Sequence, residues 1–164
     1  EEDDEIGVGC AGGVDVTATR SYIEEPTSQT TIPYVISVKG LQGGHSGMDI
    51  HKGFGNANKI LSRLLYNGFE RFGLRVSKID GGSLRNAIPR ESTAIVVVDV
   101  VHKTTFEDAT TTLIAAIEKE FQTLEPDLNI SVNPTNLPET VMELGVQQPL
   151  LKALNVAHKF LSNM

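Results

Sequence analysis

The sequence feature that most limits the possible folds is an apolar run in the second half of the chain. Residues 94–98 (AIVVV) are all apolar, and Asp99 closes the run. With their neighbours they predict a strand over residues 93–101 that is buried on both faces or central in its sheet. The run is far shorter than the roughly 20 apolar residues that a membrane-spanning helix needs. The sequence therefore predicts a fold with a buried sheet and no membrane partner.

Three further strands are predicted from β-branched and alternating apolar residues. The four predicted strands cover residues 32–41, 74–79, 93–101 and 128–132. The segment 80–83 between the second and third of them is expected to be a turn.

Two amphipathic helices are predicted between these strands. The first begins after Asn56, a good N-cap residue, and is expected to end at Gly68. The second is expected to open at Thr105, which stands three residues before Asp108 in a capping-box-like arrangement, and to stop at Pro126.

The order of these elements from residue 32 is β-α-β-β-α-β. This order predicts an α+β, ferredoxin-like fold, with an antiparallel sheet and both helices on one of its faces. An extended segment over residues 14–19 is expected before this unit. A loop over residues 133–138 and a last helix from about Pro149 are expected after it.

Charge and composition exclude several classes of partner. The formal net charge is −7, but residues 1–5 carry five of the 21 acidic groups, which leaves 14 basic against 16 acidic groups elsewhere. A nearly neutral body with 5% aromatic residues offers no footprint for nucleic acid. One cysteine, Cys10, excludes an internal disulfide and fits a reducing, cytoplasmic compartment.

Several short motifs favour ordinary structural interpretations. Residues 7–12 match GxGxxG, but no apolar strand precedes them and no helix former follows, so a glycine-rich turn is favoured over a nucleotide site. Ser46 lacks the second glycine of a hydrolase elbow. His45 and His51, with Asp49 between them, lack a third ligand at metal-site spacing, so no metal is assigned to this chain.

Two glycine-rich segments together resemble a known family. Residues 40–47 (GLQGGHSG), 50–53 (IHKG), 55–59 (GNANK) and 81–91 (GGSLRNAIPRE) resemble the signature of the Xaa-His dipeptidases, also called aminoacyl-histidine dipeptidases or peptidase D. Residues 9–15 (GCAGGVD) look like the point where the chain of these enzymes leaves its catalytic domain. The family belongs to the dizinc peptidases that include the carnosinases.

The resemblance implies roles for four residues of the chain. His45 matches the histidine that crosses the dimer to polarise the scissile carbonyl in the partner subunit's active site. Asn86 matches a residue that binds substrate, and Arg85 and His51 beside these positions are assigned at most a supporting part. An oxyanion-stabilising donor on a mobile glycine loop is chemically reasonable, because charge develops on the carbonyl oxygen in the transition state.

The resemblance also implies that this chain is one part of a larger enzyme. The zinc-ligand motifs of the family do not occur in it, so two zinc ions are expected in the full-length enzyme, none here, and the chain alone is expected to be inactive. Residues 1–31 would connect to the catalytic domain, residues 32–136 would form the lid or dimerisation domain, and residues 137–164 would lead to the rest of the lid. A homodimer acting on dipeptides in the cytoplasm is the expected assembly.

A second hypothesis from another class stays open at this point. A stand-alone ferredoxin-like module could bind or sense a small ligand through the loops at His45 and Asn86 without catalysis. The mass of the natural gene product would separate the two hypotheses.

Overall fold

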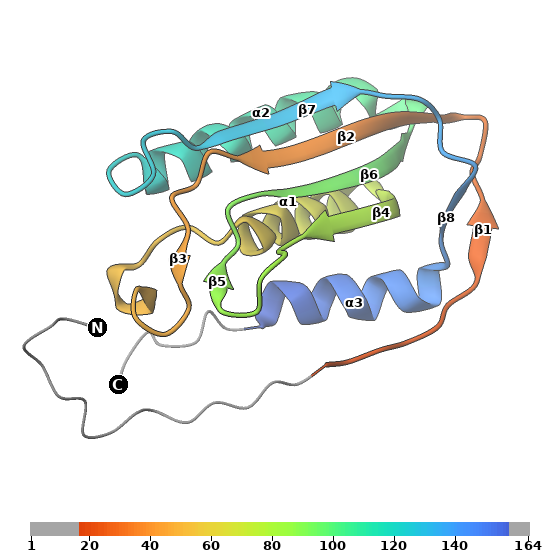
Figure 1. The fold of residues 1–164 in the computed structure, drawn as a ribbon. Coiled ribbons are helices and arrows are strands. Elements are labelled where there is room, and N and C mark those ends of the chain that lie inside the picture. The colour runs from red at the N-terminus through yellow and green to blue at the C-terminus, as the bar shows by residue number, and fades with distance from the viewer. Residues whose placement is uncertain (1–16, 158–164) are drawn as a thin grey trace, which may run out of the picture.

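The main sheet has the ferredoxin-like strand order that the sequence predicted. The computed structural model describes residues 17–157, and every pair of neighbouring strands in this sheet is antiparallel. The strands in spatial order are β4 (Arg75–Gly81), β6 (Ser92–Asp99), β2 (Thr31–Lys39) and β7 (Asn129–Pro134). The first and third strands of the β-α-β-β-α-β unit lie in the middle (Figure 1), so the predicted α+β fold is confirmed.

Both helices of the unit cover the same face of the sheet. Helices α1 (Ala57–Phe72) and α2 (Lys103–Phe121) lie behind the sheet in Figure 1. Alternate strand residues meet one stripe of each helix there, and the core includes Tyr34, Ile36, Val38, Ile60, Leu61, Leu65, Val96, Val98, Phe106 and Ile117. Strand β6 lies between β4 and β2, which confirms the central place predicted for the apolar run.

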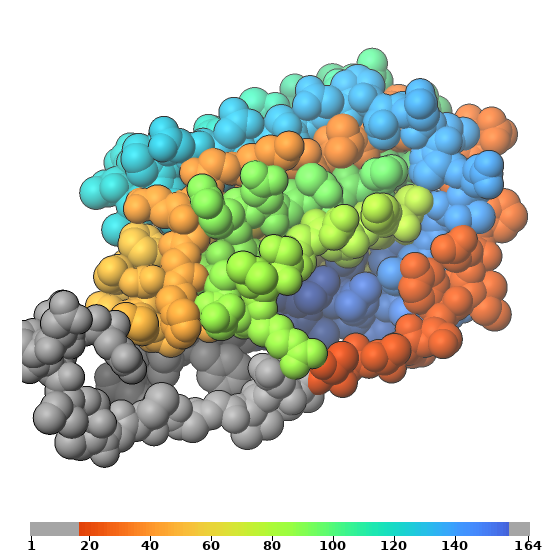
Figure 2. Space-filling model, viewed as in Figure 1, coloured from red at the N-terminus to blue at the C-terminus, as the bar shows by residue number. Residues whose placement is uncertain are grey.

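The opposite face of the sheet, turned to the viewer in Figures 1 and 2, is not covered by any helix of the described residues. Pro33, Val35 and Ile95 are half-buried on this face. The last helix, α3 (Leu144–Val156), packs against α1 and the edge of the sheet instead.

Two short strands that the sequence did not predict close one end of the sheet. Strands β1 (Glu24–Pro26) and β8 (Thr140–Met142) pair antiparallel with each other, and a 3-10 turn, η2 (Val100–His102), precedes α2. Strand β1 lies before residue 31 and strand β8 lies after residue 136, so both are outside the predicted limits of the lid domain. Those limits stay predictions.

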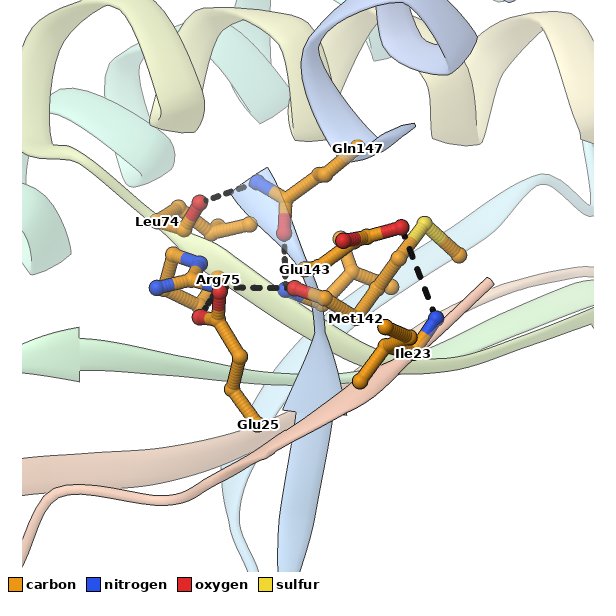
Figure 3. A network of polar contacts seen from close by, with 8 residues as sticks. Ile23, Glu25, Leu74, Arg75, Met142, Glu143 and Gln147 are labelled. Carbon is orange, nitrogen blue, oxygen red and sulfur yellow. Dashed lines mark hydrogen bonds and ion pairs between the residues drawn. The ribbon is translucent and has the colours of Figure 1, made fainter. Parts of the chain in front are cut away.

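A polar network attaches β1, β8 and α3 to strand β4 (Figure 3). The side-chain Nε2 of Gln147 donates to the Leu74 carbonyl at 2.7 Å, and its Oε1 accepts from the Val76 N–H at 2.8 Å. The Arg75 guanidinium donates to Glu25 at 2.6 Å and to the carbonyl of residue 142 at 2.7 Å. Gln147 therefore satisfies one carbonyl and one N–H at the beginning of the free edge of β4, in place of another strand.

The ends of α1 and α2 differ from the prediction. Helix α1 continues through the buried Gly68 to Phe72 and ends at Gly73, which adopts φ +63°. A side chain at residue 68 would lie 2.7 Å from Leu74, so this glycine serves close packing and does not end the helix. Helix α2 begins at Lys103, and the Thr105 hydroxyl donates to the carbonyl of residue 102, so the predicted capping box is wrong.

Two prolines also have other positions than predicted. Helix α2 ends at Phe121, five residues before Pro126. Pro149 does not open the last helix but lies inside it. The ring removes one hydrogen bond to the carbonyl of Gly145, and this residue is exposed, so water can satisfy the carbonyl.

Some predictions fall outside the described residues. These are the GxGxxG match over residues 7–12, Cys10, and the first part of the extended segment at residues 14–16; residues 17–19 have no regular structure. No helix within residues 17–157 is long and apolar enough to cross a membrane.

Candidate functional site

The two glycine-rich segments of the sequence lie side by side in the structure. The His45 loop (residues 40–55) joins β2 to α1, and the Asn86 loop (residues 82–91) joins β4 to β6. Each contributes a two-residue strand, β3 (Gly44–His45) and β5 (Ala87–Ile88), and these strands pair antiparallel. The Ser46 N–H also donates to the Asn86 carbonyl at 2.8 Å. The fold therefore brings together His45 and Asn86, which are 41 positions apart in the sequence.

The His45 side chain is exposed, and its ring has a defined tautomer. The backbone N–H groups of Gly47 and Met48 both donate to His45 Nδ1, at 3.1 Å and 3.2 Å. An imidazole nitrogen that accepts hydrogen bonds carries no proton, so in the neutral ring the proton is on Nε2. The loop thus presents His45 as an Nε2–H donor, the form that can stabilise negative charge on a carbonyl oxygen.

The backbone of His45 is held by Asp49. The His45 N–H donates to Asp49 Oδ2 at 2.7 Å, and the Asp49 N–H donates back to the His45 carbonyl at 2.9 Å. Lys52, in the one-turn helix η1 (Ile50–Lys52), forms an ion pair with Asp49 at 2.7 Å. The hydrogen bond from Lys52, and next that from the His45 backbone, hold the pKa of Asp49 below its usual value of 3.8. Asp49 therefore stays ionised at neutral pH and fixes the turn that carries His45.

Glycines allow close packing within the His45 loop and between the two loops. Gly44 has φ +151°, and a side chain there would lie 2.9 Å from Asp49. Gly43 has φ +71°, and a side chain there would collide with the Arg90 side chain. Arg90 Nε donates to the Leu41 carbonyl at 3.1 Å, so this arginine ties the Asn86 loop to the His45 loop.

Asn86 and Arg85 are exposed at the tip of the second loop. A cavity of about 530 Å³ lies along this loop, with Asp80, Gly82, Leu84, Ile88 and Arg90 among its lining residues. His51 is also exposed, on η1 of the first loop. The structure thus places all four predicted site residues on the two paired loops.

No group of three or more His, Cys, Asp or Glu side chains within residues 17–157 could hold a metal ion. In particular, Asp49, the carboxylate between the two histidines of the first loop, is engaged with the His45 backbone and Lys52. The residues described here therefore do not fit a zinc site.

Three structural residues of the site were not found from the sequence. The sequence suggests Asp49 only as a metal ligand, although Asp side chains in turns commonly accept hydrogen bonds from nearby backbone N–H groups. Arg90 lies in the second glycine-rich segment, but the sequence indicates no role for it. Glu125, which lies 70 residues from its partner Gly55, left no local signal at all.

Comparisons with known proteins identify the family to which this chain belongs. Residues 36–125 match the family model of the peptidase dimerisation domain. This match covers more than half of the chain, so the chain belongs to the peptidase dimerisation domain family, and the resemblance found in the sequence is confirmed.

Two similar proteins are dipeptidases. The cytosol non-specific dipeptidase of Escherichia coli K12 is 47% identical over 98 residues, which cover 60% of this chain and 20% of that protein. The crystal structure of aminoacylhistidine dipeptidase from Vibrio alginolyticus superposes with a TM-score of 0.77 at 32% identity, over 82% of this chain and 27% of that one. The chain thus spans about a fifth to a quarter of the length of these relatives.

More distant structures share the fold alone. An amidase of the hydantoinase/carbamoylase family from Burkholderia multivorans matches with a TM-score of 0.52 at 18% identity, over 75% of this chain and 31% of that one.

Proposed function

We propose that this chain is the lid and dimerisation part of a zinc-dependent dipeptidase, and that His45 acts in the active site of the partner subunit. Family membership and the dipeptidase relatives support the enzyme class. The observation that carries the role of His45 is the pair of backbone N–H groups that point at Nδ1, from which we infer that Nε2–H is the donor.

The chemistry assigned to His45 is stabilisation of the carbonyl oxygen. When water attacks a peptide carbonyl, negative charge develops on its oxygen, and a donor fixed before the reaction stabilises that charge more than it stabilises the substrate. The turn over residues 45–49 fixes the ring in this way. Asn86, on the paired loop, binds the substrate beside it, and Arg85 and His51 support this binding.

We place the two zinc ions of the proposed enzyme outside residues 17–157, where no set of ligands fits them. When bound, zinc supplies the activated water that attacks the carbonyl. The described residues contribute orientation of the substrate and the donor, and they need a second subunit to bring His45 to the reaction. The proposed assembly is therefore a homodimer.

The proposed substrates are dipeptides, including those with a C-terminal histidine, and the proposed compartment is the cytoplasm. The names of the relatives from Escherichia coli and Vibrio alginolyticus motivate both proposals. The composition gives no reason to propose nucleic acid or membrane as a partner. The other hypothesis, a stand-alone ligand-binding module, is not favoured because the relatives are dipeptidases much longer than this chain.

Replacement of His45 by alanine in the full-length protein tests the proposal. Removal of one oxyanion donor lowers kcat by about 10²- to 10³-fold with a smaller change in KM. Asn86→Ala is expected to act more through KM. His102→Ala is a matched control, because this histidine packs on Phe72 at the start of α2 and not on either loop. Equal kcat values for the His45→Ala variant and this control would refute the role of His45.

A further inference from the structure

A buried carboxylate contacts the two ends of the His45 loop. Glu125 stands in the turn between α2 and β7 and is only 2% exposed. Its position is fixed by its own N–H, which donates to the Phe121 carbonyl at 2.8 Å, and by its carbonyl, which accepts from the Leu128 N–H at 3.1 Å. Burial of a carboxylate costs free energy unless its oxygens are hydrogen-bonded, so the partners of this side chain indicate what it is used for.

The two oxygens of Glu125 bind the two ends of the His45 loop. Oε2 accepts from the Gln42 N–H at 2.8 Å, and Oε1 accepts from the Gly55 N–H at 2.6 Å. The loop segment between these two amides contains β3, the turn with Asp49, and η1. A single carboxylate therefore closes the loop that carries His45, through two charge-assisted hydrogen bonds.

Two glycines, Gly40 and Gly55, allow the His45 loop to pack closely against the turn that contains Glu125. A side chain at Gly55 would lie 2.6 Å from Leu41 and 3.3 Å from Glu125, so only glycine lets the amide reach the carboxylate. A side chain at Gly40, which has φ +79°, would collide with the carbonyl of Asp127 in the same turn. The Gln42 side chain also donates to the Leu124 carbonyl. The loop and the turn thus meet at several points on either side of the carboxylate.

We propose that Glu125 is a positioning residue that fixes the position and orientation of the His45 loop for catalysis. It does not touch substrate, and it acts through the two amides at residues 42 and 55. The catalytic part of this inference rests on the proposed function. The mechanical part, that the carboxylate holds the loop, does not.

A merely structural residue would have a different signature. Loss of a buried group that supports only the core weakens the whole domain, and every protected amide then exchanges faster. Loss of a loop anchor releases the loop and leaves the central strands protected. The two roles are therefore separated by where hydrogen exchange increases.

The experiment compares three variants in the full-length protein: Glu125→Ala, Glu125→Gln and the control Ile117→Val. Ile117 is buried in the core on α2 and its side chain has no polar group that could bond a loop amide, so its replacement lowers Tm without removing a hydrogen bond of the loop. Glu125→Gln has the shape of the native side chain, but its amide nitrogen cannot accept a hydrogen bond, so it anchors one loop end at most. This variant keeps the test decisive if Glu125→Ala does not fold.

Hydrogen exchange and steady-state kinetics are the two readouts. Glu125→Ala is expected to accelerate exchange over residues 42–55 by about tenfold or more, with β6 unchanged, and Glu125→Gln is expected to give a smaller increase. With a dipeptide substrate, kcat is expected to fall by about 10²-fold in Glu125→Ala, with a smaller change in KM, and to stay unchanged in Ile117→Val.

Three results would overturn the inference. These are unchanged exchange over residues 42–55, an equal increase in β6 and in the loop, or a released loop with wild-type kcat in a protein whose kcat depends on His45. If the wild-type protein does not cleave dipeptides, the proposed function fails, and the exchange data alone still decide whether Glu125 anchors the loop.

Discussion

Replacement of Gln147 by alanine is expected to detach α3 from the edge of the sheet. Gln147 is 0% exposed, and its amide bonds the Leu74 carbonyl and the Val76 N–H at 2.7 Å and 2.8 Å (Figure 3). Leu74 and Val76 are themselves buried, so water cannot easily replace the lost partner. The sheet edge would retain one orphaned donor and one orphaned acceptor.

The expected loss of stability follows from these two groups. Each unsatisfied buried backbone group costs about 1–3 kcal/mol, so the loss of partners for two such groups should lower the free energy of unfolding by about 2–6 kcal/mol. Many domains have a total stability of about 5–15 kcal/mol, so this is a large effect. Gln148→Ala is the matched control, because the neighbouring residue is exposed and its replacement should change stability by about 0.5 kcal/mol or less.

Urea unfolding, followed by circular dichroism, measures the free energy of unfolding of both variants and of the wild type. Gln147→Glu adds a test of direction: ionised, this side chain accepts from Val76 but has no proton to donate to Leu74, and protonated it can do both. Its carboxyl pKa should therefore be raised in the folded state, and its deficit in stability should shrink as the pH falls. The reasoning is refuted if Gln147→Ala and Gln148→Ala unfold at the same urea concentration with the same slope.

Two further predictions concern other polar side chains, the buried Tyr34 and the half-buried Lys59. Burial, and next the carboxylate of Glu107, raise the pKa of Tyr34 to about 12, so its contribution to stability is complete below pH 10 and is lost as the pH rises to about 12. Tyr34→Phe should remove this dependence of stability on pH. If the free energy of unfolding, measured with urea, falls equally in the wild type and in Tyr34→Phe over this alkaline range, the assignment is contradicted. Lys59 donates to the carbonyls of residues 154, 155 and 157 at 2.6–3.0 Å. Lys59→Met should cost about 1–3 kcal/mol and accelerate exchange at the end of α3, whereas native protection there would show that the contact is unimportant.

The regular part of the fold was predictable because its signals are local. The β-branched run of β6 lies in the centre of the sheet, and the apolar stripe of α1 packs against it in the core. The predicted Asn56 cap is confirmed, because the Asn56 side chain accepts from the Lys59 N–H at 3.2 Å. The ends of helices depend on tertiary packing. Gly68 looked like a helix end because the sequence does not show that Leu74 folds back onto it.

The short strands could not be predicted. Strands β1 and β8 have three residues each and pair across more than 100 positions, as Glu24 and Met142 do. Strands β3 and β5 have two residues each. Such pairs have no periodicity, and they form because the surrounding fold brings their backbones together.

The candidate site was predicted in part, and from resemblance more than from pattern. Local chemistry alone gave His45 no role beyond that of a loop residue. The fold supplies what the sequence lacks: the Asn86 loop beside it, two backbone donors on Nδ1, and Glu125 beneath it. These contacts join residues up to 83 positions apart, so no local window contains them.

The central claim is that His45 serves the active site of the partner subunit, and mixed dimers test it most directly. One full-length variant carries His45→Ala, and the other carries a neutral replacement of the catalytic carboxylate in its catalytic domain, so each homodimer is inactive. Half of the dimers in an equal, randomly exchanged mixture are mixed, and each should contain one working site of two. The account therefore predicts recovery of about a quarter of wild-type dipeptidase activity per subunit. If the mixture stays as inactive as its parents while exchange is shown to occur, His45 does not act across the dimer and the account is contradicted.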